Sequence, residues 1–275
     1  MSLILVGWPG KAQTGAARQL AEDWRLEYKF VHIQKDEWWK AADDVKTTQF
    51  LVIWNGWQYH SPLAVEVAKR HGIPYVIFEQ GFLHQKRSWS FDTQGFNKDS
   101  SLNGSLAWVS QEHLSELNVV RERLQRQHPL EPKGHVLAIC QIHNDTQILY
   151  NTPYRGMQEF IEDLAVMYPR QEVIIRPHPG SHAKRQPSND MHRVEGGGDF
   201  LATASKASVI VGLTSTCLIE AGILGVPVVA LGDCPLRTHA RRDHDRLLAG
   251  YLAHRIKNHG RPLAPFLESM GVRPL

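Results

Sequence analysis

The fold of this chain is decided most clearly by the stretch VIVGLTSTCLIEAGILGVPVVAL at residues 209–231. It opens with a short apolar run at 209–211, passes through a hydroxyl-rich turn into a helical pattern at about 216–224, and closes with a second apolar run at 228–231. Short apolar runs of this kind predict buried strands. Strand, helix and strand in this order predict parallel neighbours joined by a right-handed crossover.

The same alternation extends in both directions from this stretch. The further apolar runs that predict strands are 3–6, 50–54, 75–78, 136–140 and 172–176. The helical patterns between them are 13–24, 62–70, 111–127 and 154–167. Residues 128–134 carry two prolines and a glycine and are typical of a linker. We therefore predict an α/β protein with two Rossmann-like domains, residues 1–130 and 131–275.

Composition narrows the class of protein further. The chain has 275 residues with 42% hydrophobic and 21% charged residues, as in ordinary globular proteins. Its three cysteines, Cys140, Cys217 and Cys234, lie far apart without CxxC spacing, which argues against a disulfide framework or a structural zinc site. The first residues lack a signal-peptide pattern, and no apolar stretch is long enough to span a membrane. We expect a soluble cytoplasmic protein whose net charge of +3 suits an anionic ligand.

Polar residues follow several of the predicted strands, where open α/β sheets bind ligands. Glu79 lies at the end of one strand, and partial burial there would suit a general acid or base; a structural hydrogen bond to the following turn is the alternative. Gln141 and Asp145 follow another strand. Asp145 would serve either as a nucleophile or base or as a helix N-cap.

Two further clusters suit an anion such as phosphate. Arg176 and His178 are stiffened by the prolines around them, and a fixed imidazole beside a guanidinium favours anion binding. Ser215 and Thr216 begin the helix of the stretch quoted above, where free backbone N–H groups favour phosphate. Glu220, one turn further, would reach ribose hydroxyls. The alternative for this cluster is a capped and well-packed helix.

Several common motifs are absent from the sequence. There is no GxGxxG, GxxxxGK[ST], HExxH or paired CxxC. We therefore predict no metal site. An aromatic set would either stack on sugars or bases or pack in the core; its members are Trp38, Trp39, Trp54, Trp57 and Trp89.

Taken together and in order, these clusters resemble the capsule polysaccharide transferases of the KpsS and KpsC type, which transfer Kdo (3-deoxy-manno-octulosonic acid). The E-x-G segment of the family is similar to residues 79–81, and its G-x-N and S-S stretch to residues 90–102. Residues 141–147 match Q-x-x-x-D-x-Q, and residues 176–179 match R-x-H-P. Residues 215–227 match S-T-x-x-x-E-A followed by G-x-P. The likeness covers about Tyr75 to Leu231, more than half of the chain.

The resemblance implies a GT-B-like architecture, in which an acceptor-side domain (1–130) and a nucleotide-sugar-binding domain (131–275) face each other across a cleft. It implies CMP-activated Kdo or a similar donor as co-substrate, no other cofactor, and retention of the sugar's configuration. Asp145 would be the nucleophile and Glu79 the acid/base. The donor site would comprise Gln141, Arg176, His178, Ser215, Thr216 and Glu220.

Several functions remain open from the sequence. The leading one is a glycosyltransferase acting on a glycan or glycolipid. A phage-type transferase acting on hydroxymethylated bases of DNA is the second, with a phosphate-binding face formed by Arg185, Arg193, Arg237, Arg241, Arg242, Lys257 and Arg261. The others are a nucleotide-sugar epimerase and a non-catalytic nucleotide-sugar binding module.

Overall fold

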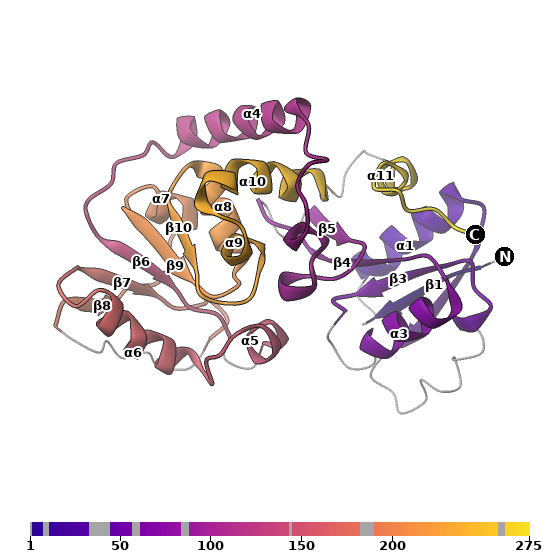
Figure 1. Ribbon diagram of the computed structural model, residues 1–275, viewed down its shortest axis with the longest axis horizontal. Coiled ribbons are helices and arrows are strands. Elements are labelled where there is room, and N and C mark those ends of the chain that lie inside the picture. The colour runs from indigo at the N-terminus through magenta and orange to yellow at the C-terminus, as the bar shows by residue number, and fades with distance from the viewer. Residues whose placement is uncertain are drawn as a thin grey trace. The chain divides into compact units, whose positions relative to one another are not determined.

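The chain forms two compact units (Figure 1). The computed structural model describes residues 2–7, 11–32, 45–56, 61–83, 88–142, 145–181, 190–257 and 262–275. The first unit comprises Met1–Ser101 and His254–Leu275, and the second comprises Leu102–Ala253.

The first unit contains a six-stranded sheet in the order β11-β5-β4-β3-β1-β2. Four strands are parallel: β1 (Ser2–Gly7), β2 (Glu27–His32), β3 (Phe50–Trp54) and β4 (Tyr75–Gln80). β5 (Ser88–Asp92) runs antiparallel to β4, and β11 (Arg255–Lys257) runs antiparallel to β5. The helices are α1 (Lys11–Asp23), α3 (Ser61–His71) and α11 (Leu263–Ser269), with a 3₁₀ turn at Asn97–Asp99. A second 3₁₀ turn, Ser101–Asn103, lies where the chain passes into the second unit.

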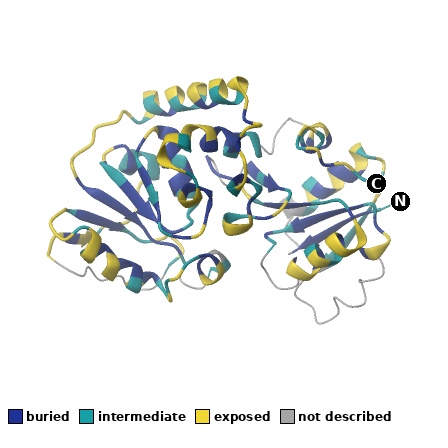
Figure 2. Ribbon diagram, in the orientation of Figure 1, coloured by how far each residue is buried: buried dark blue, intermediate teal, exposed yellow. Residues whose placement is uncertain are grey.

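Alternation along β1 explains how helices cover both faces of this sheet. Leu3 and Leu5 pack in one core with residues of α1 and α11, whereas Ile4 and Val6 pack in another with residues of α3. Successive side chains of a strand point to opposite faces, so a continuous apolar run is buried on both sides. Figure 2 shows these strands buried and the outer sides of the helices exposed.

The second unit has a fully parallel sheet in the order β10-β9-β6-β7-β8. The strands are β6 (Val136–Ile139), β7 (Val173–Arg176), β8 (His192–Val194), β9 (Val209–Gly212) and β10 (Val228–Ala230). Its helices are α4 (Gln111–Gln127), α5 (Thr146–Asn151), α6 (Met157–Met167), α7 (Phe200–Ala204), α8 (Thr216–Leu224), α9 (Pro235–Thr238) and α10 (His244–Ala253), with a 3₁₀ turn η4 (Arg241–Asp243). Figure 1 shows α6 on one side of this sheet and α4, α8 and α10 on the other.

Both units therefore have Rossmann-like topologies. Numbered within its own unit, the second sheet has the strand order 3-2-1-4-5 of the Rossmann type, and the order β2-β1-β3-β4-β5 in the first is that of the flavodoxin type. The predicted α/β class with two Rossmann-like units is confirmed. Among the described residues, no helix combines the length and apolar character needed to cross a membrane.

The division between the units differs from the boundary near residue 130 that the linker composition predicts. Helix α4 belongs to the second unit, because Arg121 Nε donates to the carbonyl of Ile223 at 3.1 Å and Gln125 Nε2 donates to that of Leu224 at 2.9 Å. Those carbonyls end α8 and have no partner within the helix. The chain then returns to the first unit after Ala253, where β11 pairs with β5. The functional roles assigned to the two domains stay predictions.

Candidate functional site

The predicted donor residues lie at the carboxyl ends of three neighbouring strands of the second unit. Ile139, at the end of β6, pairs with Arg176 of β7 on one side and with Gly212 of β9 on the other. The loops that follow these strands therefore leave the sheet side by side. The chain order reverses between β6 and β9, and such a switch point is where open α/β sheets bind ligands.

Gln141 joins two of these loops. Its Oε1 accepts a hydrogen bond from the backbone N–H of Thr214 at 3.0 Å, and its Nε2 donates to Thr214 Oγ1 at 3.3 Å. Gln141 is 7% exposed. Its amide thus fixes the spacing of the loops after β6 and β9, so the structure gives this predicted donor contact a positioning task.

Asp145 stands at the start of α5. Its carbonyl accepts from the N–H groups of Ile148 at 2.9 Å and Leu149 at 3.1 Å, and its own N–H donates to Ile142 at 3.1 Å. The residue is half-buried. The backbone therefore holds Asp145 in the N-cap position, which the sequence left as its structural alternative, and anchors it on both sides.

His178 has a defined tautomer in its neutral form. Its Nδ1 accepts a hydrogen bond of 3.0 Å from the backbone N–H of Gly180, so the proton of the neutral ring lies on Nε2. The residue is exposed at the end of the β7 loop. An Nε2–H donor on an exposed ring is suited to a phosphate oxygen.

The Arg176 guanidinium is already hydrogen-bonded within the second unit. The guanidinium donates to the carbonyl of Gly198 at 2.8 Å and to Thr203 Oγ1 at 3.2 Å, and it lies 6.0 Å from the ring centroid of Phe200. These contacts tie β7 to the start of α7. The predicted pairing of Arg176 with a bound anion would have to share or replace them.

Ser215 caps α8, as predicted for the start of this helix. Its Oγ accepts from the N–H of Cys217 at 3.2 Å, and Thr216 is the first helical residue. Glu220 is half-buried one turn further along. Burial raises the pKa of the Cys217 thiol to about 11, with the Glu220 carboxylate adding to the shift, so this thiol stays protonated at neutral pH and is a poor nucleophile.

Glu79 lies in the first unit, on β4, and is half-buried. The side-chain amide of Asn55 donates to Glu79 Oε1. Asn55 follows β3, is 7% exposed, and adopts a left-handed backbone with φ of 64°. Its contact with Glu79 was missed from the sequence, although a polar residue directly between a buried strand and a glycine is the signal that would have found it.

The rest of the E-x-G segment is held closely. A Cβ on Gly81 would lie 2.6 Å from Ser88 Oγ, so only glycine fits between β4 and β5 there. Arg255, on the returning C-terminal strand, donates to the carbonyls of Phe82 and Leu83 at 2.6 Å each. These contacts fix the turn that follows Glu79.

The stretch 90–102 is organised by a buried carboxylate, Asp92. It accepts from the backbone N–H groups of Gln94 and Gly95 at 2.8 and 3.1 Å. It also accepts from the hydroxyls of Ser100 and Ser101 at 2.8 and 3.0 Å. Gly95 of the G-x-N stretch and both serines of the S-S stretch are thus hydrogen-bonded to Asp92, around which this loop is built.

Of the aromatic set, Trp54 and Trp89 pack in the core of the first unit. Trp54 lies 5.1 Å from Phe78 and 6.0 Å from Trp89 between ring centroids, both edge-on. Trp38, Trp39 and Trp57 lie outside the described residues, as do His143, Asn144, Arg185 and Arg261.

Three of the four described arginines of the suggested DNA-binding face have carboxylate partners. Arg193 pairs with Glu172 and Glu195, Arg237 pairs with Asp233 at 2.6 Å, and Arg242 lies 3.8 Å from Asp243. This pairing fits a solvated surface, the alternative that the sequence left open. Within the described ranges, no group of three or more His, Cys, Asp or Glu side chains is placed to hold a metal ion.

Comparison with known proteins agrees with this fold. No protein-family model matches the sequence. The chain is 25% identical over 222 residues to the protein FixF of Sinorhizobium fredii, covering 76% of this chain and 52% of FixF, so it spans about half the length of that relative. In structure it is similar to the KpsC β-Kdo 2,7 transferase of Thermosulfurimonas dismutans, with a TM-score of 0.65, 18% identity and 92% of both chains covered. The KpsC β-Kdo 2,4 transferase of the same organism gives a TM-score of 0.61 at 19% identity, over 90% of this chain and 89% of that one.

The resemblance inferred from the motifs is therefore confirmed at the level of the fold. The chain has the GT-B fold of the KpsC Kdo transferases.

Proposed function

We propose that this chain is a glycosyltransferase that moves a sugar from a nucleotide-sugar donor to a glycan or glycolipid acceptor. The observation that carries the proposal is that Gln141, His178 and Ser215 all follow the carboxyl ends of neighbouring strands in a Rossmann-type sheet, beside its switch point. The fold shared with KpsC β-Kdo transferases supports it.

The donor would bind at this edge of the second unit. The His178 Nε2–H and the N-terminus of the nine-residue helix α8 offer donors to its phosphate. Glu220, on the first turns of the same helix, would accept from ribose hydroxyls. The two hydrogen bonds between Gln141 and Thr214 would fix the distance between the loops after β6 and β9, which form this donor site.

The proposed chemistry has two steps. The Asp145 carboxylate attacks the anomeric carbon, the bond from that carbon to the phosphate oxygen breaks, and the nucleotide leaves with its charge offset by the donors at His178 and α8. Glu79 then takes the proton of the acceptor hydroxyl, whose oxygen attacks the same carbon and releases Asp145. Two inversions retain the configuration of the sugar.

The first experiment is a thermal-shift panel of CMP, UDP, GDP and their sugars. A ligand that binds only the folded protein stabilises it by about 2.7 kcal/mol at one hundred times its Kd. We expect one nucleotide class, CMP in the first instance, to raise the melting temperature, and His178→Ala to reduce that rise. A panel without any shift would contradict the proposal.

The second experiment separates catalysis from donor binding. Asp145→Ala and Glu79→Ala should each lower kcat by about 10²-fold or more while the donor still raises the melting temperature. Glu162→Ala, an exposed carboxylate on α6, is the matched control. Full activity of both variants would indicate a binding module instead, and donor turnover without acceptor would indicate an epimerase. Activity that survives EDTA would support metal independence.

A further inference from the structure

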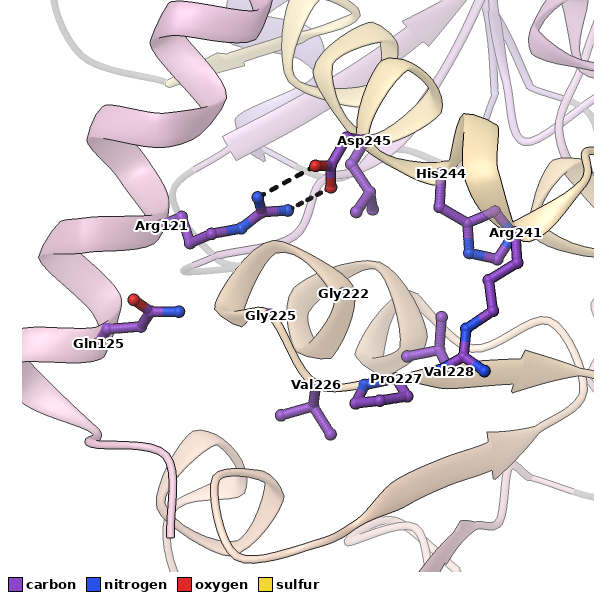
Figure 3. Close-up of a pocket in the computed structure, with 11 residues that line it drawn as sticks. Arg121, Gln125, Gly222, Gly225, Val226, Pro227, Val228, Arg241, His244 and Asp245 are labelled. Atoms are coloured by element: carbon purple, nitrogen blue, oxygen red, sulfur yellow. Dashed lines mark hydrogen bonds and ion pairs between the residues drawn. The ribbon is translucent and has the colours of Figure 1, made fainter. Parts of the chain in front are cut away.

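A pocket of about 370 Å³ lies in the second unit between α4, α8 and α10 (Figure 3). Its lining residues are Arg121, Gln125, Gly222, Gly225, Val226, Pro227, Val228, Arg241, His244, Asp245 and Leu248. Val226 and Pro227 precede β10, so the pocket lies at the amino end of that strand. The proposed donor residues follow the carboxyl ends of β6, β7 and β9. The pocket and the proposed donor site therefore lie at opposite ends of the strands of the same sheet.

Contacts among the three helices hold the walls of the pocket. Arg121 and Gln125 of α4 reach across to the last carbonyls of α8, as described above. Gly222 lets α10 approach α8, because a Cβ there would lie 3.1 Å from Leu248 Cδ1. Gly225 has φ of 101°, which ends α8 in the left-handed region and turns the chain along the floor of the pocket.

The charges in the pocket do not cancel. Arg121 donates two hydrogen bonds to Asp245, at 2.6 and 3.3 Å, and this contact holds the pKa of Asp245 below its usual value. That pair is neutral as a whole. Arg241 has no hydrogen bond or ion pair from its guanidinium within the described part of the chain. Figure 3 shows its side chain running from η4 beside Val228, with His244 next to it.

Next to this cation the pocket offers an apolar surface. Val226, Val228 and Leu248 are buried side chains of the lining, and Pro227 lies between the two valines. A guanidinium presents a planar set of N–H donors that matches phosphate and carboxylate groups. The volume is at the small end of the range for pockets that bind organic ligands.

We propose that this pocket binds a small organic anion, with its phosphate or carboxylate on Arg241 and its apolar part on Pro227, Val228 and Leu248. This site is separate from the proposed donor site and does not depend on the proposed function. Within the pocket, Asp245 is hydrogen-bonded to Arg121. The negative charge of the Asp245 carboxylate limits how much negative charge a bound ligand can carry.

The test is isothermal titration of the full chain with phenyl phosphate, inorganic phosphate and phenol. We expect phenyl phosphate to bind more tightly than either fragment, because it uses both the cation and the apolar floor. Arg241→Gln should weaken this binding by about tenfold or more, the magnitude of a charge-assisted hydrogen bond. Asp245→Asn should tighten it, because Arg121 then keeps an uncompensated charge.

Arg242→Gln is the matched control. Arg242 is exposed, adjacent in sequence, and does not line the pocket. Its variant should keep the Kd within about twofold, as for a surface substitution away from the site. The titrations are repeated in His178→Ala, so that binding at the donor site does not contribute. The proposal is overturned by absence of binding, by an unchanged Kd in Arg241→Gln, or by equal losses in the two arginine variants.

Discussion

The two hydrogen bonds between Gln141 and Thr214 give the most specific prediction about the stability of this fold. We expect Gln141→Leu to destabilise the second unit, because leucine has a similar volume but no polar atoms. The substitution removes both hydrogen bonds that span the loops after β6 and β9. It leaves the backbone N–H and the hydroxyl of Thr214 without the partner that they have in the native protein.

The magnitude follows from these two contacts. A neutral hydrogen bond contributes about 1 kcal/mol net, and a buried donor left without a partner costs about 1–3 kcal/mol. Thr214 is half-buried, so water satisfies part of its lost contacts, and leucine gains some apolar burial. We therefore expect a loss of about 2 kcal/mol in the free energy of unfolding. Gln141→Glu keeps an acceptor for the Thr214 N–H and should lose less.

The assay is urea unfolding followed by circular dichroism, with hydrogen exchange to locate the change. Exchange should accelerate in β6, β9 and the loops after them, and much less in the first unit. Gln127→Leu is the control, since Gln127 is exposed at the end of α4. A loss no greater than that of the control, or faster exchange confined to other strands, would refute the reasoning.

Three further predictions concern other positions. Burial lowers the pKa of His135 below its ordinary 6.5, so the wild type should lose stability relative to His135→Leu as pH falls through the folded pKa, which pH-dependent unfolding measures. Gly81→Ala places a Cβ 2.6 Å from Ser88 Oγ and should cost about 1–3 kcal/mol, whereas Gly15→Ala, with nothing within 4 Å in helix α1, should gain about 0.5–1 kcal/mol in the same unfolding assay. Asn55→Gly keeps the left-handed backbone but removes the side-chain amide that donates to Glu79, the proposed base. We expect kcat to fall by about tenfold with little change in KM. The acidic limb of the pH–rate profile should move to higher pH, because loss of the N–H donor favours the protonated carboxyl of Glu79.

Local patterns explain which elements could be predicted from the sequence. The helix expected at 111–127 matches α4 because its signals are local: Ser110 caps it and its apolar positions recur at helical spacing. β5 and β11 were not predicted. Each is short, and their pairing joins residues 88–90 to 255–257, a contact that no local window contains. The return of the C-terminal segment to the first unit escaped prediction for the same reason.

The sequence predicted which polar residues make up the candidate site, but not which of them are held by hydrogen bonds within the protein. Strand ends could be located from the apolar runs, and this placed Gln141, Arg176 and His178 at one edge of the sheet. Which of them is free to meet a ligand depends on partners distant in sequence. Gln141 is occupied by Thr214 and Arg176 by the start of α7, whereas His178 presents its Nε2.

Two carboxylates of the first unit show how the surroundings separate structure from chemistry. An ionised carboxylate accepts about four hydrogen bonds. Asp92 is 1% exposed and receives backbone N–H and hydroxyl donors on both oxygens, so its capacity is filled by its own loop. Such a group stabilises the fold and has no lone pair left for a substrate proton. Glu79 lies one strand away and is half-buried, and the side-chain amide of Asn55 donates to its Oε1. A general base must be accessible to a substrate proton as well as held in orientation, and this difference in burial is the physical reason for proposing Glu79 rather than Asp92 as the acid/base.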